Sequence, residues 1–100
     1  MSKLYNEVLV SYDIEDNRQR NKLFRALKEV ALRPVQKSVF WGHLNHAEER
    51  AVRRLLKEFC GKNDRAFIVR ARLSTQIAEK NSVGYASDDF PGSPRRYHVL

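Results

Sequence analysis

The sequence predicts an α+β fold in which two amphipathic helices cover one face of an antiparallel sheet. Stretches of alternating or continuous apolar residues, typical of strands, occur at residues 8–14, 35–44 and 65–73. Two stretches with helical periodicity lie between them, at residues 16–31 and 47–60. If the middle strand region is split in two, the order of elements is strand, helix, strand, strand, helix, strand. This is the order of the ferredoxin-like, or split βαβ, fold.

The first predicted strand, residues 8–14, carries a single carboxylate near its end. Val8, Val10 and Tyr12 alternate on one face of this strand, and Asp13 lies on the other. An ionised carboxylate within an apolar strand is costly to bury unless another group pairs with it. We therefore expect a partner for Asp13, and the sequence leaves three kinds open: a metal ion, an arginine or backbone N–H groups.

The first helix is predicted to begin after Asp16 and to run to about Ala31. The Asp16 side chain can accept a hydrogen bond from the backbone three residues later, and Gln19 can reach back as in a capping box. Pro34 is expected to stop the helix, because the residue before a proline is pushed out of the helical region. The basic residues of this helix that remain for solvent or a ligand are Arg18, Lys22, Arg25 and Lys28.

The second helix, predicted from Ala47 to Cys60, is amphipathic along its length. Asn45 and Glu48 form a capping signal before it. Its apolar stripe consists of Ala51, Val52, Leu55, Leu56, Phe59 and Cys60. Its polar face carries Glu49, Arg50, Arg53, Arg54, Lys57 and Glu58, with expected ion pairs Glu49–Arg53 and Arg54–Glu58. The cations of this face form either a phosphate-binding surface or a merely solvated one.

The remaining strands are less clearly bounded. Residues 35–44 are strand-like and form either one long bent strand or two short ones, with Gly42 suited to a bulge or a turn. Residues 65–73 are predicted to form the last strand of the domain, with Phe67 on one face and Ile68 on the other.

Residues 1–73 are predicted to form the domain, and residues 74–100 a C-terminal tail. The tail is rich in serine, glycine, asparagine, aspartate and proline, and it has too few apolar residues for a core of its own. Ser82–Ala86 and Tyr97–Leu100 are candidates for short strands. We expect the tail to be disordered or to lie against another surface.

Charge and composition favour a nucleic-acid partner. The net charge is +7, from 19 Lys and Arg against 12 Asp and Glu, which favours polyanions and places nucleic acid ahead of membrane. No apolar run approaches the roughly 20 residues of a spanning helix, and the N-terminus lacks a signal-peptide pattern. Cys60 is the single cysteine, so we expect a reducing, cytoplasmic location. A domain of 100 residues is marginally stable alone, which makes a dimer plausible.

Three features together resemble the Cas-two family of CRISPR-associated adaptation proteins. They are VSYDI at the first strand, a basic helix with Arg20, and VQKSVFWGHL about 20 residues after Asp13. The resemblance covers the chain up to Arg72 and implies a ferredoxin-like homodimer with facing sheets, whose C-terminal strand commonly crosses to the partner subunit. It also implies an endonuclease of RNA or DNA that depends on Mg²⁺, with Mn²⁺ as the alternative ion. In spacer acquisition the family is the scaffold between dimers of the Cas-one integrase.

Residue by residue, the resemblance implies a metal-binding and catalytic role for Asp13, with Tyr12, Arg20 and Phe40 as further catalytic positions and Ser38 matching the motif's serine. The sequence departs from the family pattern at Lys22, Pro34 and Trp41. The residues expected to bind nucleic acid are Arg18, Arg20, Lys22, Arg50, Arg53, Arg54 and Lys57.

The implied chemistry is hydrolysis of a phosphodiester bond. Mg²⁺ prefers oxygen ligands, neutralises charge on a phosphate and makes a bound water nucleophilic. One carboxylate per chain is a thin ligand set, so the hypothesis places one ion between the Asp13 side chains of two copies. Arg20 and nearby cations would clamp the phosphate.

The sequence is also compatible with purely structural roles for these residues and with different functions. Asp13 could cap a loop or pair with Arg20, and Tyr12, Phe40 and Trp41 could simply pack in the core or an interface. The dimer could be a non-catalytic adaptor for the integrase. It could also be a ribonuclease toxin resembling virulence-associated protein D, or a ferredoxin-like RNA-binding module.

Overall fold

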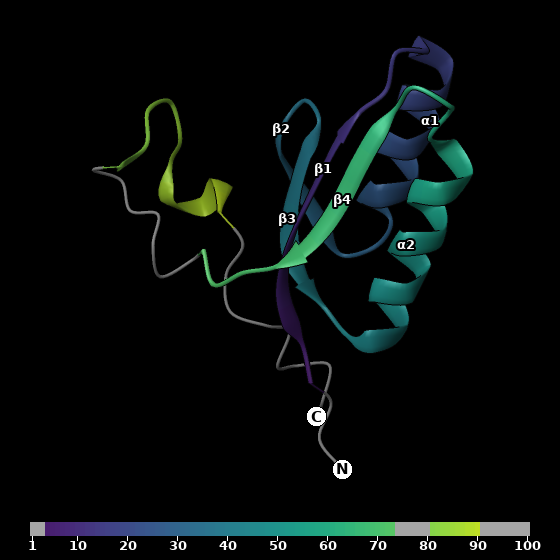
Figure 1. The fold of residues 1–100 in the computed structure, drawn as a ribbon. Helices are drawn as coiled ribbons and strands as arrows, with labels where there is room; N and C mark the ends of the chain where they lie inside the picture. Colours follow the sequence, from purple (N-terminus) through teal and green to yellow (C-terminus); the bar gives the residue numbers. More distant parts are fainter. Residues whose placement is uncertain (1–3, 74–80, 91–100) are drawn as a thin grey trace.

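The computed structural model describes residues 4–73 and 81–90 (Figure 1). In chain order the elements are β1 (Asn6–Asp13), α1 (Asn17–Lys28), β2 (Leu32–Gln36), β3 (Val39–Leu44), α2 (His46–Phe59), β4 (Arg65–Arg70) and a short 3₁₀ helix, η2 (Ser87–Asp89). The predicted order of strands and helices is confirmed. The middle strand-like region consists of two strands, β2 and β3, and the α+β arrangement is consistent with a ferredoxin-like fold.

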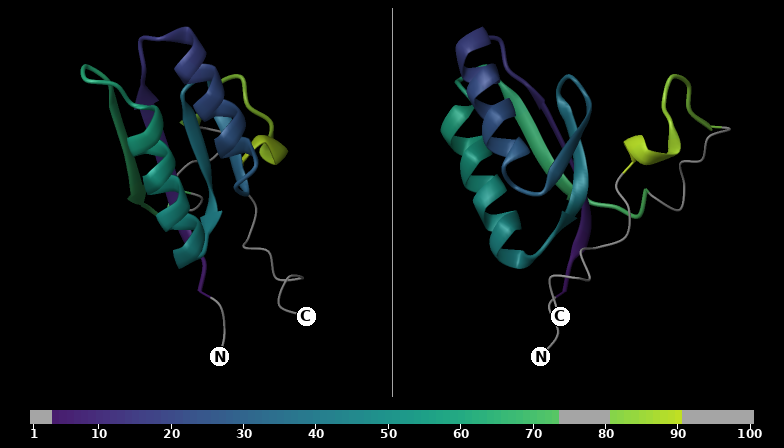
Figure 2. Two further views of the ribbon diagram at one scale, coloured as in Figure 1. Left: turned by 90° about the vertical axis from the view of Figure 1, so that its right-hand side faces the viewer. Right: turned by 180° about the vertical axis from the view of Figure 1, so that it is seen from behind.

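The four strands form one antiparallel sheet in the order β2-β3-β1-β4. β1 is central, and its Val10 is paired with Phe40 of β3 on one side and Ile68 of β4 on the other. Both helices lie on the same face of the sheet (Figure 2). Among the described residues, neither helix is long and apolar enough to cross a membrane.

The hydrophobic core lies between the sheet and the two helices. β1 supplies Val8, Val10 and Tyr12 from one of its faces, as the alternation predicts. The other buried apolar residues of this cluster are Ile14, Leu23, Leu27, Leu32, Phe40, Leu44, Val52 and Leu56.

α1 ends earlier than the sequence predicts. It stops at Lys28 rather than near Ala31, and the Glu29 backbone N–H donates to the carbonyls of Ala26 and Leu27. Ala31 then adopts a left-handed conformation with φ of 40°, which turns the chain directly into β2. Pro34 consequently lies inside β2 and not at a helix end. It is tolerated there because β2 is an edge strand and next to an irregularity in the β2–β3 pairing.

Gly42 is neither a bulge nor a turn, but a point of close backbone approach. It lies within β3, where an added Cβ would be 2.8 Å from the Ala31 carbonyl oxygen and 3.1 Å from a Leu32 methyl group. The left-handed turn at Ala31 therefore requires a residue without a side chain at position 42.

Gly42→Ala is expected to destabilise the protein by about 1–3 kcal/mol, because the Ala31 carbonyl must move to accept the methyl group. Thermal unfolding followed by circular dichroism would measure this. Gly61→Ala is the control, since its added Cβ would meet only the Asp64 carboxylate. Equal melting temperatures for the two variants would contradict the close-approach role of Gly42.

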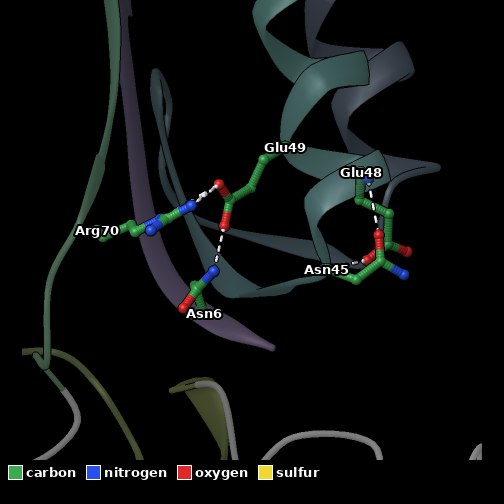
Figure 3. A network of polar contacts seen from close by, with 5 residues as sticks. All are labelled: Asn6, Asn45, Glu48, Glu49 and Arg70. Atoms are coloured by element: carbon green, nitrogen blue, oxygen red, sulfur yellow. Dashed lines mark hydrogen bonds and ion pairs between the residues drawn. The ribbon is translucent and has the colours of Figure 1, made fainter. Parts of the chain in front are cut away.

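Glu49 does not belong to the solvent-facing side of α2 as the sequence suggested. It is only 3% exposed, and its carboxylate accepts hydrogen bonds from Arg70 at 2.9 Å and from Asn6 at 2.8 Å (Figure 3). The expected ion pair of Glu49 with Arg53 is thus replaced by one with Arg70 on β4. The capping box of Asn45 and Glu48, drawn in the same figure, is confirmed.

This network gives a pH-dependent contribution to stability. Burial alone would raise the pKa of Glu49, but hydrogen bonds from Arg70 and Asn6 and the nearby positive charges outweigh it and hold the pKa below its ordinary value of 4.5. A lowered carboxyl pKa adds stability above the unfolded-state pKa, and that stability is lost as the pH falls through the folded-state value.

Glu49→Gln is therefore expected to cost about 1 kcal/mol at pH 7, discounted because Arg70 is largely exposed. The difference from wild type should shrink as the pH falls well below 4.5, where both proteins carry a neutral side chain. Urea unfolding at pH 7 and at a pH well below 4.5 would measure this difference in stability, with Glu58→Gln as the control because Glu58 is exposed. A difference that stayed constant with pH would contradict this account.

Residues 81–90 lie on the sheet face opposite the helices (Figure 1). The Tyr85 hydroxyl donates to the Val35 carbonyl oxygen at 2.8 Å, and the Phe90 ring lies 5.5 Å from that of Trp41. The strand expected at Ser82–Ala86 does not form, and Gly84 instead has a left-handed φ of 85°. The second candidate strand, Tyr97–Leu100, lies outside the described residues.

Candidate functional site

A pocket of about 580 Å³ opens at the end of β1. It lies where the β1–α1 loop, the first half of α1 and the β2–β3 turn meet. Its lining residues are Tyr12, Asp13, Ile14, Arg20, Asn21, Phe24, Lys37 and Ser38. The pocket therefore brings together Asp13, Tyr12, Arg20 and Ser38, which the sequence singled out, although β1, α1 and the β2–β3 turn are separate in the chain.

Asp13 is the last residue of β1 and is exposed. Its backbone is paired with Arg65 of β4, but among the described residues its carboxylate takes part in no hydrogen bond or ion pair. Asp13 is therefore not buried as its place in an apolar strand suggested, and of the three kinds of partner expected, neither an arginine nor a backbone N–H of the described residues pairs with its carboxylate, whereas the metal ion stays a prediction. Asp13 also neither caps the loop nor pairs with Arg20, which leaves its oxygens available to a ligand.

Arg20 is bound to the loop that follows β1. Its guanidinium donates to the carbonyl oxygens of Ile14 at 2.8 Å and Glu15 at 3.4 Å, and to the side-chain oxygen of Asn17. Asp16 caps α1 within the same loop by accepting from the Gln19 backbone at 2.9 Å. These bonds fix the path of the chain directly after Asp13.

Tyr12 and Phe40 support the pocket from below. Tyr12 is 4% exposed and Phe40 is wholly buried, with their rings 6.3 Å apart. The Phe40 ring also meets the edge of Phe24 at 5.2 Å. Phe40 thus does not reach the pocket surface in this conformation, and its contacts are those of a core residue that holds the floor of the pocket.

The Tyr12 hydroxyl is a poor candidate for a base. Burial raises its pKa above the ordinary value, and the positive charge of Arg20 only partly opposes this. The phenol is consequently neutral near neutral pH and donates to the Lys37 carbonyl oxygen at 3.4 Å. Tyr12 therefore ties β1 to the β2–β3 turn.

Lys37 is a pocket residue that the sequence reasoning missed. It lies in the turn between β2 and β3, next to Ser38, whose carbonyl oxygen accepts the Tyr12 backbone N–H at 3.1 Å. Its place in the VQKSVFWGHL motif could have identified Lys37 from the sequence. Lys37 is recognised as a turn residue, however, only when that motif is divided into two strands.

The other cations expected to bind nucleic acid do not line this pocket. Arg18 and Lys22 are exposed on α1 beside it. We call the exposed arginine and lysine residues of α2 the α2 basic surface; its members are Arg50, Arg53, Arg54 and Lys57. It lies on the helix layer and offers a second, separate region of positive charge.

A hard divalent cation fits the donor chemistry of the pocket only in part. Mg²⁺ is commonly held by one or two carboxylates, with waters and substrate phosphates completing its shell. Asp13 supplies one such carboxylate. Within residues 4–73 and 81–90 no group of three or more His, Cys, Asp or Glu side chains could hold a metal ion. One chain thus provides an incomplete site.

Comparisons with known proteins agree with the motif. Residues 6–77 match the family described as CRISPR associated protein Cas2. A protein of Francisella tularensis subsp. novicida (strain U112), named CRISPR-associated endoribonuclease Cas2 1, is 39% identical over 97 residues, or 97% of this chain and 99% of that protein. CRISPR-associated endoribonuclease Cas2 of Desulforudis audaxviator (strain MP104C) is 34% identical over 58 residues, or 58% of this chain and 55% of that protein.

The family match spans β1 to β4 and includes Asp13, Arg20 and the β2–β3 turn, and the Francisella relative aligns along nearly the whole chain. The chain belongs to the Cas2 family of CRISPR-associated proteins.

Proposed function

We propose that this protein is a metal-dependent endonuclease that hydrolyses phosphodiester bonds of RNA or DNA and acts in CRISPR spacer acquisition. The observation that carries the proposal is Asp13, an exposed carboxylate that makes no hydrogen bond or ion pair with the described residues and lines a pocket together with Arg20 and Lys37. Two relatives are named CRISPR-associated endoribonucleases, which supports a nuclease activity and favours RNA as the first substrate to test.

The proposed functional unit is a cytoplasmic homodimer with facing sheets. Its support is the sheet face opposite the helices, where Phe67 is 52% exposed and Val69 is 44% exposed. Apolar side chains of this size on one sheet face favour burial against a second copy. A dimer would also complete the metal site, because two Asp13 carboxylates would replace the single one of each chain.

In this mechanism Asp13 would hold Mg²⁺ or Mn²⁺ through its carboxylate oxygens. The ion would supply neutralisation of charge on the scissile phosphate and a more acidic bound water. Tyr12 and Phe40 keep the strand end and the β2–β3 turn in register, so that Asp13 keeps its position. The positively charged groups around the pocket bind the phosphates on either side of the bond that breaks.

Removing divalent metal is expected to abolish cleavage. With excess chelator the purified protein should leave a labelled single-stranded RNA intact, and added Mg²⁺ or Mn²⁺ should restore cleavage. RNA binding should survive the chelator, because it rests on Lys and Arg side chains. Cleavage that continues at the same rate in chelator would contradict the proposal.

A non-catalytic adaptor is the second candidate, and the α2 basic surface favours it. Four exposed cations on one helix can hold a duplex backbone without any metal. In this case the dimer would scaffold an integrase of the Cas-one family on DNA. Duplex binding without cleavage at any Mg²⁺ or Mn²⁺ concentration would favour the adaptor over the nuclease.

A further inference from the structure

Arg20 and Lys37 are the two cations that line the pocket, and their side chains are engaged differently. The Arg20 guanidinium donates to the carbonyl oxygens of Ile14 and Glu15 in the β1–α1 loop and to the side chain of Asn17 at the start of α1. These bonds leave it only Nε–H and one Nη2–H of its five donors for a ligand. In contrast, the Lys37 side chain is exposed and makes no hydrogen bond or ion pair with the described residues.

Lys37 is nevertheless held close to Asp13 by its backbone. The Lys37 carbonyl accepts from the Tyr12 hydroxyl, and the neighbouring Ser38 carbonyl accepts from the Tyr12 backbone N–H. Tyr12 directly precedes Asp13, so the β2–β3 turn and the end of β1 are bound to each other. Lys37 and Asp13 therefore line the same 580 Å³ pocket from two elements that are bound to each other.

We propose that Lys37 is the phosphate-binding cation of the Asp13 pocket, and that Arg20 is a positioning residue that fixes the β1–α1 loop. The two roles differ because the Lys37 ammonium keeps all its N–H donors for a ligand, whereas the Arg20 guanidinium uses most of its donors on the protein itself. An ammonium on a four-carbon stem binds phosphate as a point charge, whereas a guanidinium already bound to carbonyl oxygens orders backbone. This inference rests on the proposed function, since it names the group that binds the substrate of that site.

The salt dependence of binding separates the two roles. Each phosphate contact to a single strand contributes about 0.7 to the slope of log affinity against log salt concentration. Binding would be measured by fluorescence anisotropy with a labelled single-stranded RNA, in chelator so that no strand is cut. The variants are Lys37→Gln, Arg20→Gln and, as a charge-matched control, Lys28→Gln. Lys28 lies at the opposite end of α1 from Arg20 and does not line the pocket.

Lys37→Gln is expected to reduce the slope by about 0.7 for each pocket that the RNA contacts, and to weaken binding roughly fivefold at 0.1 M salt. Arg20→Gln is expected to leave the slope unchanged, because a positioning residue contributes no phosphate contact. Its kcat should fall at unchanged KM, since the glutamine amide cannot replace the three hydrogen bonds of the guanidinium to Ile14, Glu15 and Asn17. Lys28→Gln should match wild type. An unchanged slope for Lys37→Gln, or a reduced slope for Arg20→Gln, would overturn the inference.

Failure of this inference and failure of the proposed function are distinguishable. Binding in chelator reports on Lys37 whether or not the protein cleaves RNA. If Lys37→Gln loses one phosphate contact while Asp13→Asn cleaves like wild type, the proposed metal site at Asp13 fails and the binding role of Lys37 stands. If Asp13→Asn is inactive and Lys37→Gln binds like wild type, the reverse holds.

Discussion

Replacing Asp13 by asparagine is expected to reduce metal-dependent cleavage of RNA by at least about 100-fold. The amide keeps the shape of the side chain but removes the negative charge that binds the cation, and metal catalysis is worth several kcal/mol of barrier. The folded protein should be unaffected, because Asp13 is exposed and its side chain makes no hydrogen bond or ion pair with the described residues. Cleavage rates at saturating Mg²⁺, with melting temperatures measured in parallel, test both parts.

The matched control for this substitution is Asp88→Asn, an exposed aspartate of the segment 81–90 that does not line the pocket. It should cleave like wild type. If Asp13→Asn also cleaves like wild type, the pocket at the end of β1 is not the site of hydrolysis. If neither wild type nor the variants cleave, yet all bind duplex DNA, the adaptor function is favoured over the nuclease.

Phe40→Ala is expected to destabilise the protein by about 3–5 kcal/mol, the usual cost of removing a buried phenyl ring. Phe40 is wholly buried between the rings of Tyr12 and Phe24, so the cavity would open under the pocket. Since the free energy of unfolding of such a domain is only about 5–15 kcal/mol, this substitution would remove a large fraction of it. Urea unfolding would measure the loss.

The same variant decides whether Phe40 is a core residue or a residue that touches substrate. The family resemblance implies a catalytic position, whereas the structure places the ring away from the pocket surface. Loss of cleavage in proportion to the loss of folded protein, with partial recovery in Phe40→Leu, fits a supporting role. A stable Phe40→Ala variant without activity would instead show that the ring meets the substrate.

The elements of this fold could be predicted wherever local pattern and tertiary structure agree. The alternation in β1 and the stripe of α2 are of this kind. The end of α1 is not, because Val30 and Ala31 continue the helical periodicity of the sequence. The turn at Ala31 depends on the pairing of β2 with β3 and on the close approach of the Ala31 carbonyl to Gly42. Both are contacts between residues that are separated in the sequence.

Glu49 illustrates the same limit for a charged residue. Its spacing from Arg53 fits an i,i+4 pair, and helical periodicity alone cannot tell this from burial. Burial was decided by Arg70 and Asn6, two strand residues that lie beside α2 only in the folded protein.

The candidate site was predictable to a similar degree. The motif at the end of β1 identified Asp13 and its neighbours, because the residue type and its position stand out in the sequence. The engagement of Arg20 with its own loop, and the approach of Lys37 from the β2–β3 turn, depend on backbone geometry that no pattern specifies.

The most direct test of the proposed mechanism is to locate the cation in a crystal of the protein grown with Mn²⁺, by anomalous scattering at the manganese edge. The expected result is a peak within bonding distance of Asp13 carboxylate oxygens, bridging two copies of the chain, that disappears in Asp13→Asn. A peak bound only by other residues, in a protein that cleaves RNA with Mn²⁺, would contradict a metal site built on Asp13.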